Sequence, residues 1–200
     1  MAVAAPLYPH EEVRAGEARI VLNDVPWSTY LVLRDSVRDA HTRMTYLRGR
    51  LEIMSPSREH ETDKTQIARL LELFCLERDI PLFGYGSTTF RREDKERGLE
   101  PDECYCRGED RDMPDVALEV IASSGILDKL EVYAGLGVRE VWVWKASRIT
   151  VYVLRGDAYV TAPRSELLPA LDLALLARFA DRLDQPQALR EYRDALRDPT

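Results

Sequence analysis

Glu119 lies inside the run of residues 113–122, among side chains that are mostly apolar. A strand this apolar is expected to be covered on both faces of its sheet. An ionised carboxylate in such a place is costly unless another group pairs with it. The sequence therefore indicates a site at which a cation balances the charge of Glu119.

Two other residues offer the rest of a catalytic set. Asp102 belongs to a short strand predicted at residues 101–106, and Lys129 follows in the first turn of a helical pattern. Two carboxylates and an ammonium are what the hydrolysis of a phosphodiester with a divalent cation needs. We expect Asp102 and Glu119 to hold the ion and Lys129 to assist the reaction.

Asp115 is the other acid on the strand of Glu119, and it is a poorer partner than Asp102. The two lie four residues apart, so both side chains face the same side of the strand. Their backbone positions are then roughly 13 Å apart, at about 3.3 Å per residue. One magnesium ion with ligands at about 2.1 Å is hard to share over that span. We interpret Asp115 as a strand-start residue or as a hydrogen-bond acceptor for a loop.

Lys129 and Glu61 each have a structural alternative. Lys129 shares a helix face with Tyr133, which predicts that it turns toward the sheet, but its stem could simply cover core residues. Glu61 stands in the first turn of a helix predicted from residue 58 to 78, where the helix dipole favours any acid. It could also lean toward the interior. His60 beside it is interpreted as a surface residue, with a catalytic base as the alternative.

The remaining elements are read from hydrophobic periodicity and from turn residues. Residues 1–23 are interpreted as an arm, 24–175 as the main domain and 176–200 as a helical tail. The run at 91–99 is charged and is expected to be a surface loop. Trp142 and Trp144 are interpreted as core residues or a dimer contact. The other predictions are helices at 24–38, 172–183 and 186–197, hairpins at 44–54 and 148–160, a strand at 82–90, and a strand–helix–strand crossover at 113–145.

Composition limits the class of protein. The chain has 200 residues with 45% hydrophobic and 32% charged side chains, which suits one folded domain. Its apolar runs are far too short to span a membrane. Three cysteines give no even disulfide framework, so we expect a reduced, cytoplasmic protein. The net charge of −7 argues against a protein that binds nucleic acid mainly through a basic surface.

Six segments of the chain form a recognisable series: Leu51-Glu-Ile-Met-Ser-Pro-Ser57, Gly86-Ser-Thr-Thr-Phe90, Glu100-Pro-Asp-Glu-Cys-Tyr105, Pro114-Asp-Val-Ala-Leu-Glu-Val120, Asp128-Lys-Leu-Glu-Val-Tyr133 and Gly137-Val-Arg-Glu-Val-Trp-Val-Trp144. Taken in this order, they resemble the Uma-two family of bacterial endonucleases. The resemblance covers roughly residues 24–175. It implies the restriction-endonuclease-like PD-(D/E)XK fold, an α/β class with a mixed central sheet flanked by helices.

The resemblance also implies roles for particular residues. Asp102 matches the Asp of the PD motif, Glu119 the acid of the third core strand and Glu61 the glutamate of the first core helix. Lys129 matches a lysine that this family carries on the helix. Ile121 departs from the wider superfamily, which has its lysine at that position.

The function expected from these matches is hydrolysis of DNA phosphodiester bonds with Mg²⁺ or Mn²⁺. Asp102, Glu119 and Glu61 would be the metal ligands, and a homodimer is expected by analogy with restriction-like enzymes. The alternative is a nuclease-like binding module without turnover, which the acidic charge and Ile121 favour. Cleavage of RNA or of another phosphodiester also stays open, because no residue singled out here reads a base edge or a 2′-hydroxyl.

Overall fold

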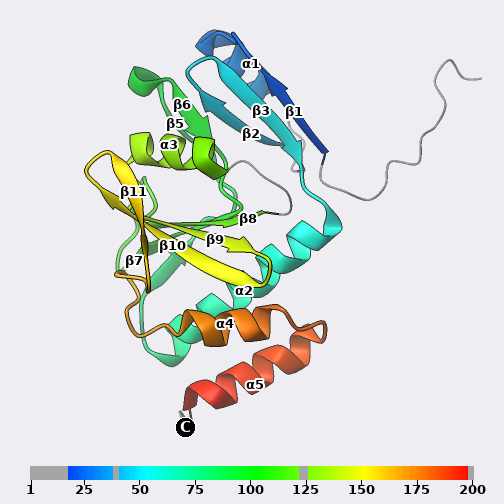
Figure 1. The fold of residues 1–200 in the computed structure, drawn as a ribbon, viewed down its shortest axis with the longest axis vertical. Helices are drawn as coiled ribbons and strands as arrows, with labels where there is room; N and C mark the ends of the chain where they lie inside the picture. Colours follow the sequence, from blue (N-terminus) through cyan, green and yellow to red (C-terminus); the bar gives the residue numbers. More distant parts are fainter. Residues whose placement is uncertain (1–17, 38–40, 122–125, 198–200) are drawn as a thin grey trace, which may run out of the picture.

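The computed structural model describes residues 18–37, 41–121 and 126–197 (Figure 1). Within these residues the chain forms two sheets and five α-helices. This mixed α/β architecture confirms the fold class expected from the sequence. Most of the expected N-terminal arm lies outside the described residues, but Ala18–Leu22 forms a strand, β1, where an arm was expected.

The larger sheet carries most of the residues of the expected site. Its strands lie in the order β11-β10-β9-β8-β7-β4. They are β4 (Leu82–Gly84), β7 (Glu103–Arg107), β8 (Val116–Val120), β9 (Glu140–Lys145), β10 (Arg148–Arg155) and β11 (Ala158–Ala162). β8 and β9 are parallel, and the other paired strands of this sheet are antiparallel. Since α3 (Ile126–Leu136) joins β8 to β9, the predicted crossover is confirmed.

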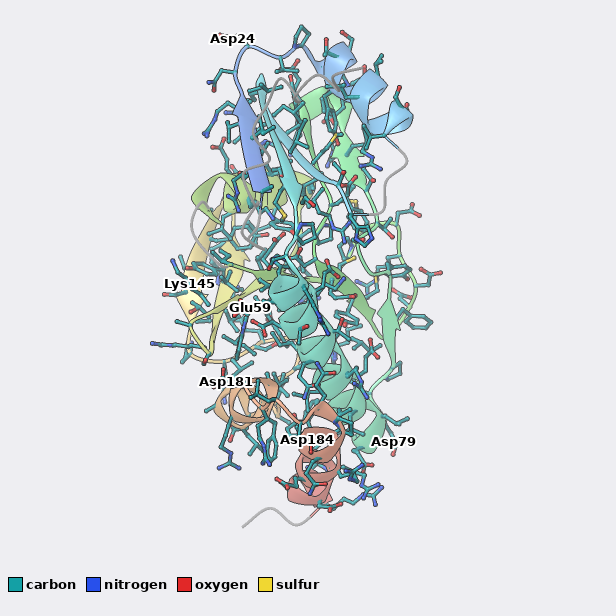
Figure 2. All side chains as sticks on the ribbon, turned by 90° about the vertical axis from the view of Figure 1, so that its right-hand side faces the viewer. Asp24, Glu59, Asp79, Lys145, Asp181 and Asp184 are labelled. Atoms are coloured by element: carbon teal, nitrogen blue, oxygen red, sulfur yellow. The ribbon has the colours of Figure 1, made fainter. Side chains whose placement is uncertain are left out.

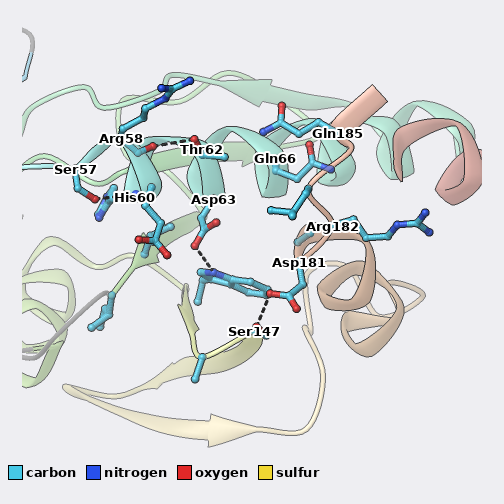
Figure 3. Close-up of a pocket in the computed structure, with 17 residues that line it drawn as sticks. Ser57, Arg58, His60, Thr62, Asp63, Gln66, Ser147, Asp181, Arg182 and Gln185 are labelled. Carbon is cyan, nitrogen blue, oxygen red and sulfur yellow. Dashed lines mark hydrogen bonds between the residues drawn. The ribbon is translucent and has the colours of Figure 1, made fainter. Parts of the chain in front are cut away.

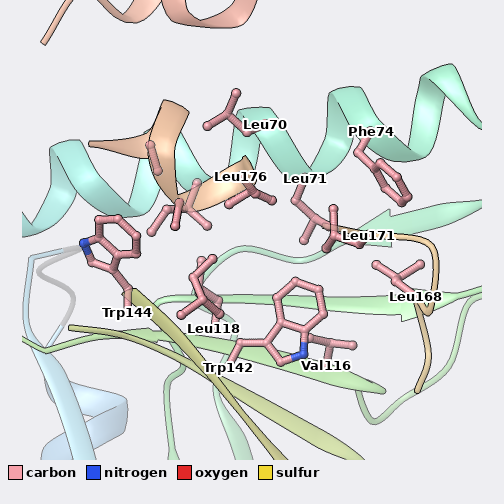
Figure 4. Close-up of a cluster of buried hydrophobic side chains, with 14 of the residues drawn as sticks. Leu70, Leu71, Phe74, Val116, Leu118, Trp142, Trp144, Leu168, Leu171 and Leu176 are labelled. Atoms are coloured by element: carbon pink, nitrogen blue, oxygen red, sulfur yellow. The ribbon is translucent and has the colours of Figure 1, made fainter. Parts of the chain in front are cut away.

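β8 is buried over its whole length because a helix covers each face. On one face Leu118 packs in a cluster with the apolar stripe of α2 (Arg58–Glu77), as Figure 4 shows. That stripe consists of Ile67, Leu70, Leu71 and Phe74, all of which are buried. On the other face Ala117 packs with side chains of α3. Successive residues of a strand alternate between faces, so Glu119 shares the α3 face with Ala117.

The two tryptophans of β9 are core residues. Trp142 is fully buried and Trp144 nearly so, and both pack in the cluster beneath α2 (Figure 4). Their indole N–H groups donate within the protein, that of Trp144 to Asp63 Oδ2 at 3.0 Å. Their burial confirms the core interpretation and excludes these side chains from a dimer contact.

The C-terminal helices extend the layer formed by α2. α4 (Leu173–Ala180) and α5 (Gln185–Arg197) lie beside α2, which runs along much of the length of the molecule (Figures 1 and 2). Arg197 forms two hydrogen bonds of 2.8 Å with the carboxylate of Glu77 at the end of α2. Among the described helices, none combines the length and the apolar character that a membrane span requires.

The smaller sheet lies at the other end of the molecule, beside α3 (Figure 1). Its strands lie in the order β1-β3-β2-β6-β5. They are β2 (Arg43–Leu47), β3 (Arg50–Ser55), β5 (Phe90–Arg92) and β6 (Arg97–Leu99), in addition to β1, and α1 (Trp27–Ser36) packs on them. The hairpin predicted at residues 44–54 is confirmed as β2 and β3.

The prediction of a surface loop at residues 91–99 is wrong. β5 and β6 pair across a short 3-10 turn at Glu93–Lys95. Arg97 is buried because its guanidinium donates to the backbone carbonyl of Glu131 at 2.8 Å. Its stem lies against Gly135 of α3, where an added Cβ would come within 2.2 Å of Arg97 Cδ. A charge-rich run thus enters the fold because a glycine makes room for the arginine.

Glu140, at the start of β9, is a second buried carboxylate that the sequence reading did not single out. It accepts four hydrogen bonds, from Trp142 Nε1, Ser165 Oγ and the backbone N–H groups of Glu166 and Leu167, at 2.7–2.9 Å. These bonds tie the segment before α4 to the central sheet. Glu140 therefore has a structural role.

Replacing Glu140 by alanine is expected to lower the free energy of unfolding by about 3 kcal/mol or more. Hydrogen bonds to a charged group contribute about 1.5–3 kcal/mol each, and the stranded donors would stay buried. Urea unfolding of Glu140→Ala measures the loss. The control is Glu166→Ala, which removes an exposed ion pair with Arg155 and should cost less than about 1 kcal/mol. Equal losses in the two variants would contradict this role.

Candidate active site

The pairing of β7 with β8 brings Asp102 and Glu119 together. Glu103 lies opposite Leu118 in this antiparallel pair, so the next position along sets Asp102 beside Glu119. Side chains directly opposite each other in such a pair have Cβ atoms about 4.5–5.5 Å apart. Both carboxylates are 0% exposed. The larger sheet therefore holds two buried acids side by side.

α3 supplies two donors to Glu119. Lys129 Nζ lies 2.6 Å from Glu119 Oε2, and the hydroxyl of Tyr133 donates to Oε1. The two donors are four residues apart, so they lie on the same face of the helix. Lys129 is buried, and its ammonium lies at the carboxylate. The structure thus brings Lys129 to Glu119, as the sequence predicted.

Asp102 is held by groups from two other elements. Its Oδ2 accepts a hydrogen bond from the backbone N–H of Val120 at 2.7 Å. Its Oδ1 lies 2.9 Å from Nε2 of His60, in the first turn of α2. Asp102 is therefore fixed by the Val120 amide at Oδ2 and lies against the ring of His60 at Oδ1.

The interpretation of His60 as a surface residue is wrong, since His60 is only 2% exposed. The side chain of Ser57 accepts from the backbone N–H of His60, which fixes the start of α2. His60 then stands seven and fourteen residues before Ile67 and Phe74, on the buried stripe. This spacing was the signal in the sequence that could have placed His60 inside.

Glu61 faces a different set of partners. Its side chain is 32% exposed and forms ion pairs with Lys64 at 2.6 Å and with Arg43 at 3.7 Å. Among the described residues, no three acidic, histidine or cysteine side chains lie close enough to hold one ion between them. The structure therefore gathers Asp102, Glu119 and Lys129, and it leaves Glu61 in a separate ion-pair cluster.

Asp115 serves a loop, in line with one of its two predicted roles. Its Oδ2 accepts from the backbone N–H of Arg107 at 2.9 Å, and its Oδ1 lies 2.6 Å from the guanidinium of Arg111. These contacts fold the polar loop that follows β7 back onto the start of β8. Asp115 takes no part in the cluster around Glu119.

The buried charges shift one another's pKa values in opposite directions. Burial raises the pKa of Glu119, and the nearby ammonium of Lys129 only partly offsets it. Burial also acts to raise the pKa of Asp102, but the contact with His60 and the charge of Lys129 outweigh it and lower that pKa. Burial alone would lower the pKa of Lys129, yet Glu119 and Asp102 raise it to about 12. Lys129 therefore stays a cation at neutral pH.

A cleft of about 810 Å³ opens beside this cluster (Figure 3). His60 and Val120, which both contact Asp102, form part of its lining. The cluster of Asp102, Glu119 and Lys129 is thus buried but adjoins a hollow large enough for a small ligand. Carboxylates are common ligands of divalent ions, and an ammonium is a common partner of phosphate.

A family model described as "Uma2: Putative restriction endonuclease" matches residues 27–184 of the chain. The matched range runs from the first residue of α1 to just beyond α4, and it contains Asp102, Glu119 and Lys129. No curated protein matches the chain.

Proposed function

Because the chain belongs to the Uma2 family of restriction-endonuclease-like proteins, we propose that it hydrolyses DNA phosphodiester bonds with a divalent cation, Mg²⁺ or Mn²⁺. The observation that carries the proposal is the buried cluster of two carboxylates and one ammonium at Asp102, Glu119 and Lys129. A cluster of this composition suits phosphodiester chemistry better than a core contact, since burying three charges is costly.

The donor set fits a hard cation. Mg²⁺ prefers oxygen ligands and is commonly held by one or two carboxylates together with substrate phosphate. Asp102 and Glu119 supply the carboxylates, and the backbone carbonyl of Val120 is a further oxygen at the end of β8. When bound, the cation would polarise the scissile phosphate and lower the pKa of a water molecule. Glu61, expected from the sequence to be a metal ligand, would hold a second ion or a metal-bound water once its ion pair with Lys64 opens.

Lys129 has the position and the charge to act on the phosphate. Glu119 and Tyr133 fix the direction of this part of α3, and Lys129 keeps its proton at neutral pH. An ammonium so placed stabilises the negative charge that develops on the phosphate in the transition state. Ile121 cannot take this role, because its side chain is apolar and its backbone N–H donates to Trp144.

The proposed activity is tested by incubating the full chain with supercoiled plasmid. We expect nicked or linear DNA with Mg²⁺ or Mn²⁺, and intact plasmid in EDTA. Glu119→Gln, purified by the same procedure, serves as the control for a contaminating nuclease. Equal cleavage in EDTA and in Mg²⁺ would show that the activity does not depend on a divalent cation.

A binding module without turnover is the second candidate, favoured by the net charge of −7 and by Ile121. Calorimetric titration with Mg²⁺ separates the two functions. A nuclease should bind the ion in a manner that Asp102→Asn weakens, whereas a binding module need not.

A further inference from the structure

The cleft adjoins the carboxylate pair through two shared residues, although Asp102 and Glu119 do not line it themselves. His60 and Val120 belong to both: each contacts Asp102, and each lines the cleft. The far wall comes from the turn between α4 and α5, and the floor from β9 and the turn that follows it. A phosphodiester held at Asp102 and Glu119 would therefore bring a neighbouring part of the DNA chain into this hollow.

The walls of the cleft offer acceptors. Asp63 Oδ2 accepts a hydrogen bond from the indole N–H of Trp144, and Asp181 Oδ1 accepts one from the hydroxyl of Ser147. Each carboxylate has its second oxygen as a further acceptor. Gln66 donates from Nε2 to the carbonyl of Phe179 at 3.4 Å. Its Oε1 is buried and accepts no hydrogen bond from the described residues. An unpaired acceptor of this kind can accept a hydrogen bond from a ligand or from water.

The arginines of the lining do not offset this acidity. Arg182 is paired with Glu191 at 2.5 Å, and Figure 3 shows its guanidinium directed away from the centre of the cleft. Arg58 also points away from Asp63 in this view. A DNA phosphate needs lysine or arginine contacts, so the sugar–phosphate chain is a poor occupant of this hollow.

A nucleobase fits the same walls well. Its amino and ring N–H groups are donors that carboxylate and amide oxygens accept. In a duplex these groups are paired and the base is stacked, so a base enters a recess only after it leaves the helix. A cleft of about 810 Å³ is within the range, about 300–1,000 Å³, that takes molecules of this size.

We propose that the cleft receives an unpaired nucleobase next to the scissile phosphate, and that single-stranded or locally unpaired DNA is the preferred substrate. This inference rests on the proposed nuclease function. It also fits the charge of the protein, because an acidic chain gains little from contact with the DNA backbone. Its affinity must come from the bound cation and from contacts with bases.

The test places a bulky side chain in the cleft from α2. Thr62 and Thr65 are both exposed on α2, and only Thr62 lines the cleft. Thr62→Trp and Thr65→Trp are therefore matched variants, which differ in the cleft and share the same chemical change. Thermal unfolding followed by circular dichroism confirms that both are folded.

Cleavage is compared on a single-stranded oligonucleotide, a duplex with one unpaired nucleotide, and the fully paired duplex. We expect wild type and Thr65→Trp to cleave the unpaired substrates about ten times faster or more, since a well-bonded base contact is worth about 1–3 kcal/mol. Thr62→Trp should lose that advantage. Equal rates on paired and unpaired DNA in wild type would overturn the proposal while leaving the nuclease in place.

Binding provides a readout independent of cleavage. Fluorescence anisotropy with a labelled single-stranded oligonucleotide in Ca²⁺ should show affinity about tenfold weaker for Thr62→Trp than for Thr65→Trp. If wild type cleaves no DNA, the nuclease proposal fails, and this measurement still decides whether the cleft binds a base. Equal affinities of the two variants would refute the assignment of the cleft.

Discussion

Glu119→Gln is expected to reduce the rate of DNA cleavage by about a thousandfold or more. The change keeps the size of the side chain but removes the charge that a divalent cation needs and that orients Lys129. Loss of a single transition-state donor costs about 10²–10³ in rate, and here both the ion and the position of the ammonium are affected. Initial rates of plasmid nicking in Mg²⁺ measure the effect.

The matched control is Glu103→Gln. Glu103 follows Asp102 directly, so its side chain points to the opposite face of the sheet. It is partly buried, and burial raises its pKa as it does that of Glu119. A general effect of removing a buried acid from this sheet would therefore appear in both variants. Comparable rates in Glu119→Gln and Glu103→Gln would show that the site has been placed on the wrong residues.

Lys129→Met is expected to lower the free energy of unfolding by about 3–5 kcal/mol. Removing one partner of a buried ion pair leaves the other charge uncompensated in a low-dielectric interior. Glu119 would keep only the hydroxyl of Tyr133 as a donor from α3. Urea unfolding of the single variant, compared with wild type, gives the loss.

The double variant Lys129→Met/Glu119→Gln separates this cause from poor packing. Replacing both charges by neutral groups of similar size is often neutral or stabilising. We therefore expect the double variant to regain most of the stability lost in Lys129→Met, without regaining cleavage. If the double variant is less stable than the single one, the cost lies in packing around the methionine rather than in the stranded carboxylate.

The sequence is sufficient to locate the pair of Asp102 and Glu119, because the pattern that marks it involves residues close together in the chain. An acid among apolar residues marks a buried charge, and the four-residue spacing to Asp115 excludes the nearer acid. The preceding strand then leaves Asp102 as the partner. Lys129 can be predicted for the same reason, because a helix that follows β8 turns side chains of its first turn toward the end of that strand.

The parts that sequence reading missed depend on contacts between distant segments. The sequence places Arg97 in a loop. The structure buries it because Gly135, on a helix further along the chain, has no side chain and leaves room for the arginine. The sequence does not reveal the role of Glu140, because three of its four donors lie about 25 residues downstream, in an irregular segment. The spacing of His60 from Ile67 and Phe74 indicates the buried face of α2. Its polar side chain, however, favours a surface position when the sequence is read alone.

The donors around Asp102 and Glu119 have a consequence for assembly. His60, Lys129, Tyr133 and the Val120 amide already lie against the oxygens of the two carboxylates. This cluster is thus assembled without an ion, unlike that of small domains that fold only around their metal. Under the proposed function, an incoming ion would compete with Lys129 and the other internal partners, which would weaken its binding and let it exchange with solvent.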